Sequence, residues 1–127
     1  MAIINEDYVS FETAKLLKEK RFPQSTFRCH YIIDGNDHYK SFEDRCGFGD
    51  YDIIAPTLAV AMKWLREVHS IHIVTVFLGP SLKWTPTIWK IDMVIPESKH
   101  IKSTFNTWET YEEACEAAIK YCLENLI

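Results

Sequence analysis

The stretch Leu65–Val76, LREVHSIHIVTV, joins an amphipathic segment to the most apolar run in the chain. Upstream of it, Pro56 pre-sets a helical entry and Thr57 can cap the helix. Apolar residues then recur at helical spacing, at Leu58, Ala61, Leu65 and Val68. Downstream, Ile71–Leu78 is almost entirely apolar, which is typical of a central strand. The stretch therefore predicts a core helix that passes directly into the most buried strand of a sheet.

A hairpin partner for this strand follows a turn at Leu78–Ser81. The next strand is predicted over Trp84–Ile95, and Pro86 near its start favours an edge position or a bulge. One face of this strand carries the alternate residues Thr85, Thr87, Trp89, Ile91, Met93 and Ile95. The other face carries Lys90 and Asp92.

The first half of the chain repeats the order of a helix and a hairpin. A helix is predicted over Ser10–Phe22, with its first residue as the N-cap and with Pro23 closing it. Alternation over Phe27–Ile33 predicts a strand, the turn residues Asp34–Asp37 follow, and His38–Phe42 returns as a second strand. The segment Glu43–Asp52 has two glycines and no periodicity, and we interpret it as a loop.

A capping box, TYEE at Thr110–Glu113, opens the last helix. The predicted order is therefore α-β-β-α-β-β-α in a single α+β domain over residues 1–127. We expect one antiparallel four-stranded sheet with the helices packed mainly on one face. The uncovered face, with Tyr39, Trp84 and the Val74/Val76 side, is where a partner or a second subunit would dock.

Composition narrows the class of protein. The net charge of −4 argues against extended binding to nucleic acid, because such domains carry a basic patch. No apolar run approaches the ~18 residues of a membrane span, and the N-terminus lacks the pattern of a signal peptide. The four cysteines, Cys29, Cys46, Cys115 and Cys122, form no C-x-x-C motif. Reduced thiols in a cytoplasm are the best interpretation.

His69 and His72 lie three residues apart where the helix meets the strand. Helical metal ligands normally stand at i and i+4, and a zinc site would need two further ligands. Those ligands would come from Cys29, His30, His38 or Cys46, which have no paired spacing. The two H-x-[ST] strands of a histidine phosphodiesterase are also missing. We interpret His69 as a helix-end residue whose partial positive charge suits the dipole, and His72 as an outward strand residue.

Other polar residues gather around the first hairpin. We expect His30 and His38 to face each other across it, either as ordinary cross-strand residues or as part of a binding pocket. The acidic residues Glu43, Asp44, Asp50 and Asp52 lack the D-x-D-x-D-G pattern of a calcium loop. We interpret them as belonging to a solvated loop.

An aromatic and basic combination lies in the second hairpin, where Lys83 and Lys90 stand beside Trp84 and Trp89. Such a set can stack a base and hold a phosphate. In the alternative interpretation, Trp89 belongs to the core and Trp84 ends the hairpin. The candidate ligand-binding residues are Trp84, Trp89, Lys83, Lys90, Tyr39, His30 and His38. No catalytic residue, metal ligand or cofactor is predicted.

Three segments together resemble a family. They are YVSFETAKLLKEKRF, APTLAVAMKWLREVHSIHI and TWETYEEACEAAIKYCLE. The chain resembles uncharacterised small proteins carried by phages and mobile elements of gut anaerobic bacteria. The shared motifs are helix caps and apolar stripes, and no catalytic motif is known for the group. The resemblance implies a setting in which small proteins often bind a component of the host, including its defence systems.

Three functions are consistent with these features. The leading hypothesis is a cytoplasmic, homo-oligomeric binding module that sequesters a host protein or a small anionic, nucleotide-like ligand. Its binding surface would be the exposed sheet face and the loop over 43–54. The second is a metal-dependent or histidine-based hydrolase that uses His30, His38, His69 and His72. The third is a structural or regulatory domain that binds only other proteins.

Overall fold

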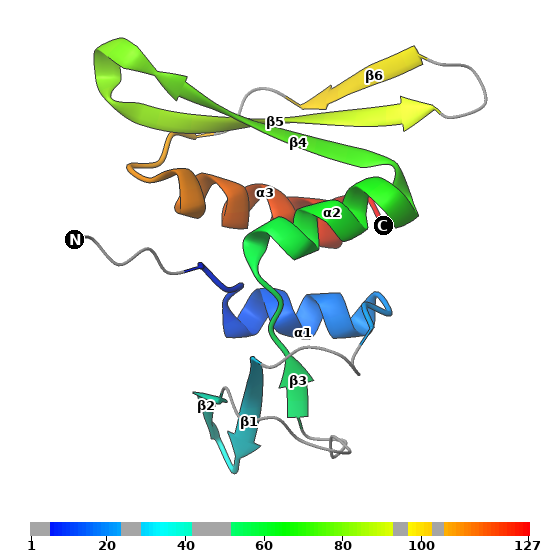
Figure 1. Cartoon of the computed structure of the whole chain (residues 1–127), viewed down its shortest axis with the longest axis vertical. Coiled ribbons are helices and arrows are strands. Elements are labelled where there is room, and N and C mark those ends of the chain that lie inside the picture. Colours follow the sequence, from blue (N-terminus) through cyan, green and yellow to red (C-terminus); the bar gives the residue numbers. More distant parts are fainter. Residues whose placement is uncertain (1–5, 24–28, 42–51, 93–96, 103–105) are drawn as a thin grey trace. The chain divides into compact units, whose positions relative to one another are not determined.

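The computed structural model describes residues 6–23, 29–41, 52–92, 97–102 and 106–127 (Figure 1). It divides into two compact units, Met1–Thr57 and Leu58–Ile127. Within the described residues the order of elements is a helix and three strands, twice, and then a closing helix. The α+β class is confirmed. That residues 1–127 form a single domain remains a prediction.

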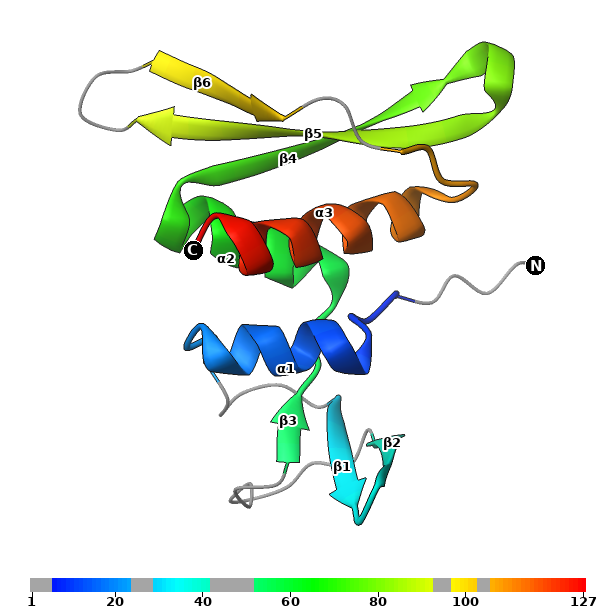
Figure 2. The same ribbon diagram turned by 180° about the vertical axis from the view of Figure 1, so that it is seen from behind.

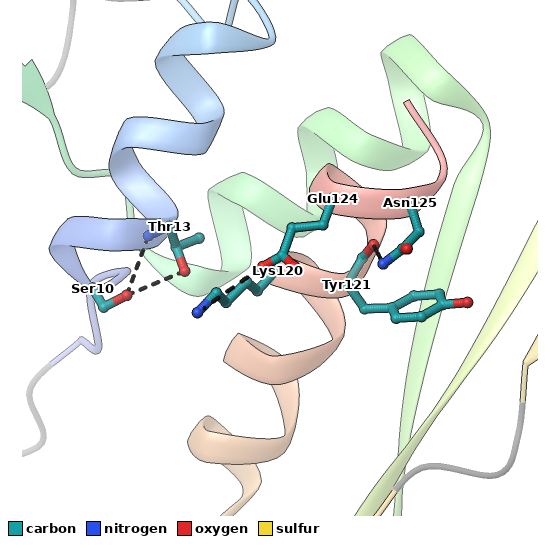
Figure 3. Close-up of polar contacts among 6 residues, drawn as sticks. All are labelled: Ser10, Thr13, Lys120, Tyr121, Glu124 and Asn125. Atoms are coloured by element: carbon teal, nitrogen blue, oxygen red, sulfur yellow. Dashed lines mark hydrogen bonds and ion pairs between the residues drawn. The ribbon is translucent and has the colours of Figure 1, made fainter.

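Helix α1, Phe11–Glu19, opens the first unit at the expected cap. The Ser10 side chain accepts a hydrogen bond from the amide of Thr13 at 3.3 Å (Figure 3). The helix ends earlier than predicted, because Arg21 adopts a left-handed φ of 69°. The amide of Phe22 then donates to the carbonyl of Leu17, and that of Arg21 donates to Lys18. This pair of bonds is the Schellman ending, here built with arginine where glycine is usual.

The first unit contains a three-stranded antiparallel sheet in the order β2-β1-β3. Strands β1, His30–Asp34, and β2, Asp37–Ser41, are joined by the predicted two-residue turn, in which Gly35 has a φ of +63°. Strand β3, Asp52–Ile54, was expected to belong to a loop. It pairs with β1 on the other side from β2. Three residues are too few to show the alternation by which a strand is recognised from sequence.

The second unit packs two helices on one face of a second three-stranded sheet. Helices α2, Leu58–His69, and α3, Tyr111–Asn125, lie on the same side of the sheet in both views (Figures 1 and 2). The strands are β4, Ile71–Leu78, β5, Lys83–Asp92, and β6, Glu97–Lys102, in the antiparallel order β4-β5-β6. The 3-10 turn Gly79–Ser81 joins the first two strands at the predicted position.

Isoleucines from the sheet and apolar residues from both helices form the core of this unit. Its buried members include Ala61, Leu65, Ile71, Ile73, Ile88, Ala118, Ile119, Cys122 and Leu123. The two cysteines of the last helix, Cys115 and Cys122, are fully buried. Burial raises the pKa of the Cys122 thiol to about 12, so this thiol stays protonated. On the outside of α3, Lys120 pairs with Glu124, and Asn125 donates to the Tyr121 carbonyl (Figure 3).

The prediction of a single four-stranded sheet is wrong. The described residues form two three-stranded sheets, one in each unit, and the order of elements contains two more strands than expected. Strand β6 escaped prediction because its sequence, ESKHIK, is charged and lacks an apolar alternation. The apolar strand β4 was expected to be central, but it lies at an edge, and β5 is the central strand.

Pro86 shows how a proline can stand in the central strand. The amide of Trp84 donates to the carbonyl of Trp108, and its carbonyl accepts from the amide of Trp108, both at 2.8 Å. The backbone groups of Trp84 therefore point away from β4, and those of Pro86 point to the same side. Strand β6 pairs with β5 only from Ile88 onward. Pro86 therefore removes no hydrogen bond between β4 and β5. The edge prediction assumed that a proline in a strand faces away from the strand with which it pairs, and Pro86 meets this condition.

The cap of α3 gives a direct test of this architecture. The Thr110 side chain accepts from the amide of Glu113 at 3.1 Å. We expect Thr110→Ala to lower the free energy of unfolding of the second unit by about 1 kcal/mol, because the amide loses its partner. Urea unfolding followed by tryptophan fluorescence measures this, since all four tryptophans lie in that unit.

Thr107 supplies the matched control for this cap, because it is exposed and precedes the helix. Thr107→Ala should leave the unfolding midpoint unchanged. An equal loss in both variants would contradict the capping role.

Candidate functional site

The predicted tryptophan pair does not form a single site. Strand β5 pairs with β4 in one continuous register, with Trp84 opposite Phe77 and Trp89 opposite His72. Residues five apart in a regular strand project from opposite faces. Trp84 therefore lies on the face that packs against the helices, and Trp89 lies on the uncovered face. The prediction that the two rings together stack one base is wrong, and so is the alternative in which Trp89 belongs to the core.

The two lysines of the predicted set are also separated. The Lys90 ammonium donates to the carbonyl of His69 at 3.0 Å. This carbonyl belongs to the last residue of α2, where a cation both caps the chain and complements the helix dipole. Lys83 is paired with Leu78 on the uncovered face. Lys90 therefore has a structural partner, and Lys83 and Lys90 do not act together on one ligand.

The predicted residues of the first unit form no facing histidine pair. His30 is opposite Ser41, and His38 is opposite Ile33. His30 is fully buried, whereas His38 is exposed and stacks on Phe11 with ring centroids 3.8 Å apart. Tyr39 follows His38 on β2 and is exposed. The prediction that the histidines face each other across the hairpin is wrong.

His69 ends α2, as predicted, and Ser70 makes the joint to β4 with a left-handed φ of 57°. The His69 ring packs edge-on against Trp64, with centroids 4.7 Å apart. Burial, and then the positive charge of Lys90, lower its pKa below the ordinary 6.5. The neutral imidazole is thus favoured, so the expected positive charge at this position is wrong. His72 lies on the uncovered face of β4, as predicted, opposite Trp89.

The described segments contain no metal-ligand cluster: across them, no group of three or more histidine, cysteine or acidic residues is arranged to hold a metal ion. The predicted acidic loop, Glu43, Asp44 and Asp50, and also Cys46, lie outside the described residues. No helix in those segments has the length and apolar character needed to cross a membrane.

An exposed apolar cluster gathers instead at the turn end of the β4–β5 hairpin. We call it the hairpin-end patch; it consists of the rings of Phe77, Trp84 and Tyr111, which contact one another through Trp84, and of Leu82, which closes the adjoining turn. The Trp84 ring lies 4.9 Å from Phe77 and 5.4 Å from Tyr111, measured between centroids. Phe77 is 47% exposed, Tyr111 41% and Leu82 72%. Figures 1 and 2 show the start of α3 beside this end of the hairpin, which explains how Tyr111 reaches the patch.

A part-buried polar contact lies beside the patch. The Thr75 hydroxyl and the Cys115 thiol are 3.2 Å apart. Burial raises the pKa of Cys115, and burial together with a hydrogen bond to Cys115 raises that of Tyr111. All three groups are therefore neutral at physiological pH, and the patch presents rings and aliphatic carbon without charge. A surface of this kind is suited to contact with apolar groups.

Of this patch, sequence reasoning identified only Trp84. Phe77 was assigned to a buried strand, and Tyr111 was assigned to the capping segment that opens the last helix. A usable signal was present in Gly79-Pro80-Ser81-Leu82, where a large apolar residue closes a tight turn. Turn positions normally hold glycine, asparagine or another polar residue, so leucine there is a departure that points to exposure.

Comparison with known protein families, with curated proteins and with solved structures found no match to this chain.

The pKa of His69 yields a pH-dependent prediction. Because the folded state favours the neutral ring, the unfolded state binds more protons below pH 6.5. The contribution of His69 to the free energy of unfolding of the second unit should therefore fall as the pH is lowered from about 6.5, and this contribution should be constant above that range. An NMR titration of the His69 ring should give a pKa below 6.5.

Lys90→Gln separates the two causes of this shift. Without the nearby cation, the His69 pKa should rise but stay below 6.5, since burial remains the larger cause. A His69 pKa at or above 6.5 in the unsubstituted protein would refute the assignment.

Proposed function

We propose that this chain is a non-enzymatic binding module, encoded by a phage or another mobile element, that sequesters a protein of its host cell. We further propose that it acts in the cytoplasm as a homo-oligomer. The observation that carries the proposal is the hairpin-end patch, with Leu82 as its most exposed member. The proposed origin in a phage or mobile element rests on the resemblance to proteins of that group, which lies in helix caps and apolar stripes.

The backbone conformation at position 82 supports a role in binding, because it is a conformation that leucine rarely adopts. It has a φ of 54° and a ψ of 35°, in the left-handed region. A leucine there costs roughly 1–2 kcal/mol relative to its usual conformation, whereas glycine and asparagine adopt it readily. The side chain recovers little of this cost within the chain, because it is 72% exposed. Strain retained at an exposed apolar residue is best explained by a contact that the residue makes with another molecule.

A protein partner fits this patch better than a nucleotide. Nucleotide binding was predicted from two tryptophans and two lysines, and the register places them on opposite faces of β5. The patch itself contains one phenylalanine, one leucine, one tryptophan and one tyrosine, without a cation to hold a phosphate. Exposed aromatic and aliphatic side chains of this kind are typical anchors of protein interfaces.

Leu82→Asn tests the proposal because its two effects have opposite signs. We expect the substitution to raise the free energy of unfolding of the second unit by about 1 kcal/mol, since asparagine relieves the left-handed strain. We expect the same substitution to abolish capture of a specific host protein from a lysate, as measured by affinity pull-down and mass spectrometry. Urea unfolding by tryptophan fluorescence gives the stability.

Val68 on α2 provides the matched control, because it is an exposed apolar residue of the same unit at 59% exposure and lies outside the patch. Val68→Ser should keep the captured protein. If Leu82→Asn captures the same proteins as the unsubstituted chain, the patch is not the binding surface.

A further inference from the structure

The edges of the two sheets differ in how they are protected against pairing with other strands. Natural proteins blunt edge strands with charge, proline or short length. Strand β2 carries Asp37 and Lys40, β6 has the charged sequence ESKHIK, and β3 is only three residues long. Strand β4 has eight residues, IHIVTVFL, with no lysine, arginine, carboxylate or proline. Among the described edges, β4 alone lacks every one of these protections.

The free edge of β4 presents a defined set of backbone groups. Because the backbone of Trp84 points toward Trp108, the facing pair Phe77 and Trp84 is one that exchanges no hydrogen bonds. The amide and carbonyl of Phe77 therefore point outward, away from β5. The same holds for every second residue of the strand, namely Ile71, Ile73 and Thr75. Within the described residues, no backbone hydrogen bond joins β4 to a segment other than β5.

We infer that β4 pairs antiparallel with β4 of a second copy of this chain, which joins two sheets into one six-stranded sheet. In the register that uses every outward amide and carbonyl, Val74 stands opposite Val74 of the second copy on a two-fold axis. Ile73 then exchanges hydrogen bonds with Thr75 of the second copy, and Ile71 does so with Phe77 of the second copy. This inference rests on the proposed homo-oligomer and names its interface.

The composition of β4 favours a second copy as the occupant. The two-fold axis places Val74 opposite its own equivalent, so a charge at this position would face a like charge. Strand β4 has none, and Val74 at the axis is 37% exposed and apolar. In such a dimer each β4 edge is covered by the other, so no β4 edge remains to which further chains could add.

A charged residue in place of Val74, on the proposed two-fold axis, tests the pairing of the two β4 strands. Sedimentation equilibrium of the full chain should show a dimer, and Val74→Lys should raise its dissociation constant at least about tenfold, because two ammonium groups meet across the axis. Val74→Glu should do the same. An equimolar mixture of the two variants should recover dimerisation, because lysine then faces glutamate.

Thr87→Lys is the matched control. Thr87 is the partner of Val74 on β5 and shares its face, but β4 separates it from the edge. The substitution should leave dimerisation unchanged if the contact is edge to edge, and should weaken it if the two sheets stack by their faces.

Hydrogen exchange of the backbone amides tests the register between the two β4 strands directly. By NMR, the amides of His72, Val74, Val76 and Leu78 should be protected at all concentrations, because they point toward β5. The amides of Thr75 and Phe77, the two outward-pointing residues that are not buried, should become protected only as the dimer forms.

The outcomes separate this inference from the proposal on which it rests. A monomer at every concentration would overturn both the homo-oligomer and the pairing. An oligomer in which mixing the Lys and Glu variants gives no recovery, or in which the outward amides stay unprotected, would overturn the pairing and leave the homo-oligomer standing.

Discussion

The continuous antiparallel register between β4 and β5 determines most of what the second unit presents to its surroundings. From Ile71 opposite Lys90 to Leu78 opposite Lys83, no bulge interrupts this ladder. Because side chains alternate strictly along paired strands, one register assigns every residue of the hairpin to a face. It directs Ile73 and Ile88 to the helices, separates Trp84 from Trp89, and brings Phe77 beside Trp84. A shift by one residue would reverse all of these assignments.

Sequence reasoning succeeded where the governing interactions are local. The caps at Ser10 and Thr110, the two-residue turn at Gly35 and the helix-to-strand joint at His69 depend on neighbours within a few residues. It failed where the arrangement of the strands depends on pairing between residues that are far apart in the sequence. The apolar character of β4 indicates burial but cannot show on which side a strand pairs. The short strand β3 and the charged strand β6 carry no periodic signal of their own.

The candidate site shows the same limit. Trp84, Trp89 and the two lysines were grouped because they are near one another along the chain, yet adjacency along a strand is what sends side chains to opposite faces. Tyr111 joins Trp84 although nearly thirty residues separate them, through the backbone pair of Trp84 with Trp108. Proximity in sequence is therefore a poor guide to a site on a sheet, and the turn conformation of Leu82 is a better one.

The two surfaces of the β4–β5 hairpin are compatible with each other. Pairing along β4 uses outward backbone groups, whereas the hairpin-end patch uses side chains at the turn. A two-fold axis at Val74 would place the two patches toward opposite ends of the joined strands, since antiparallel pairing reverses the second copy. Each dimer would then offer two separated patches, and a partner with two matching sites would be held more tightly than by one patch alone. In the proposed dimer, the unprotected edge of β4 would serve assembly, and the strained Leu82 would serve the binding of the partner.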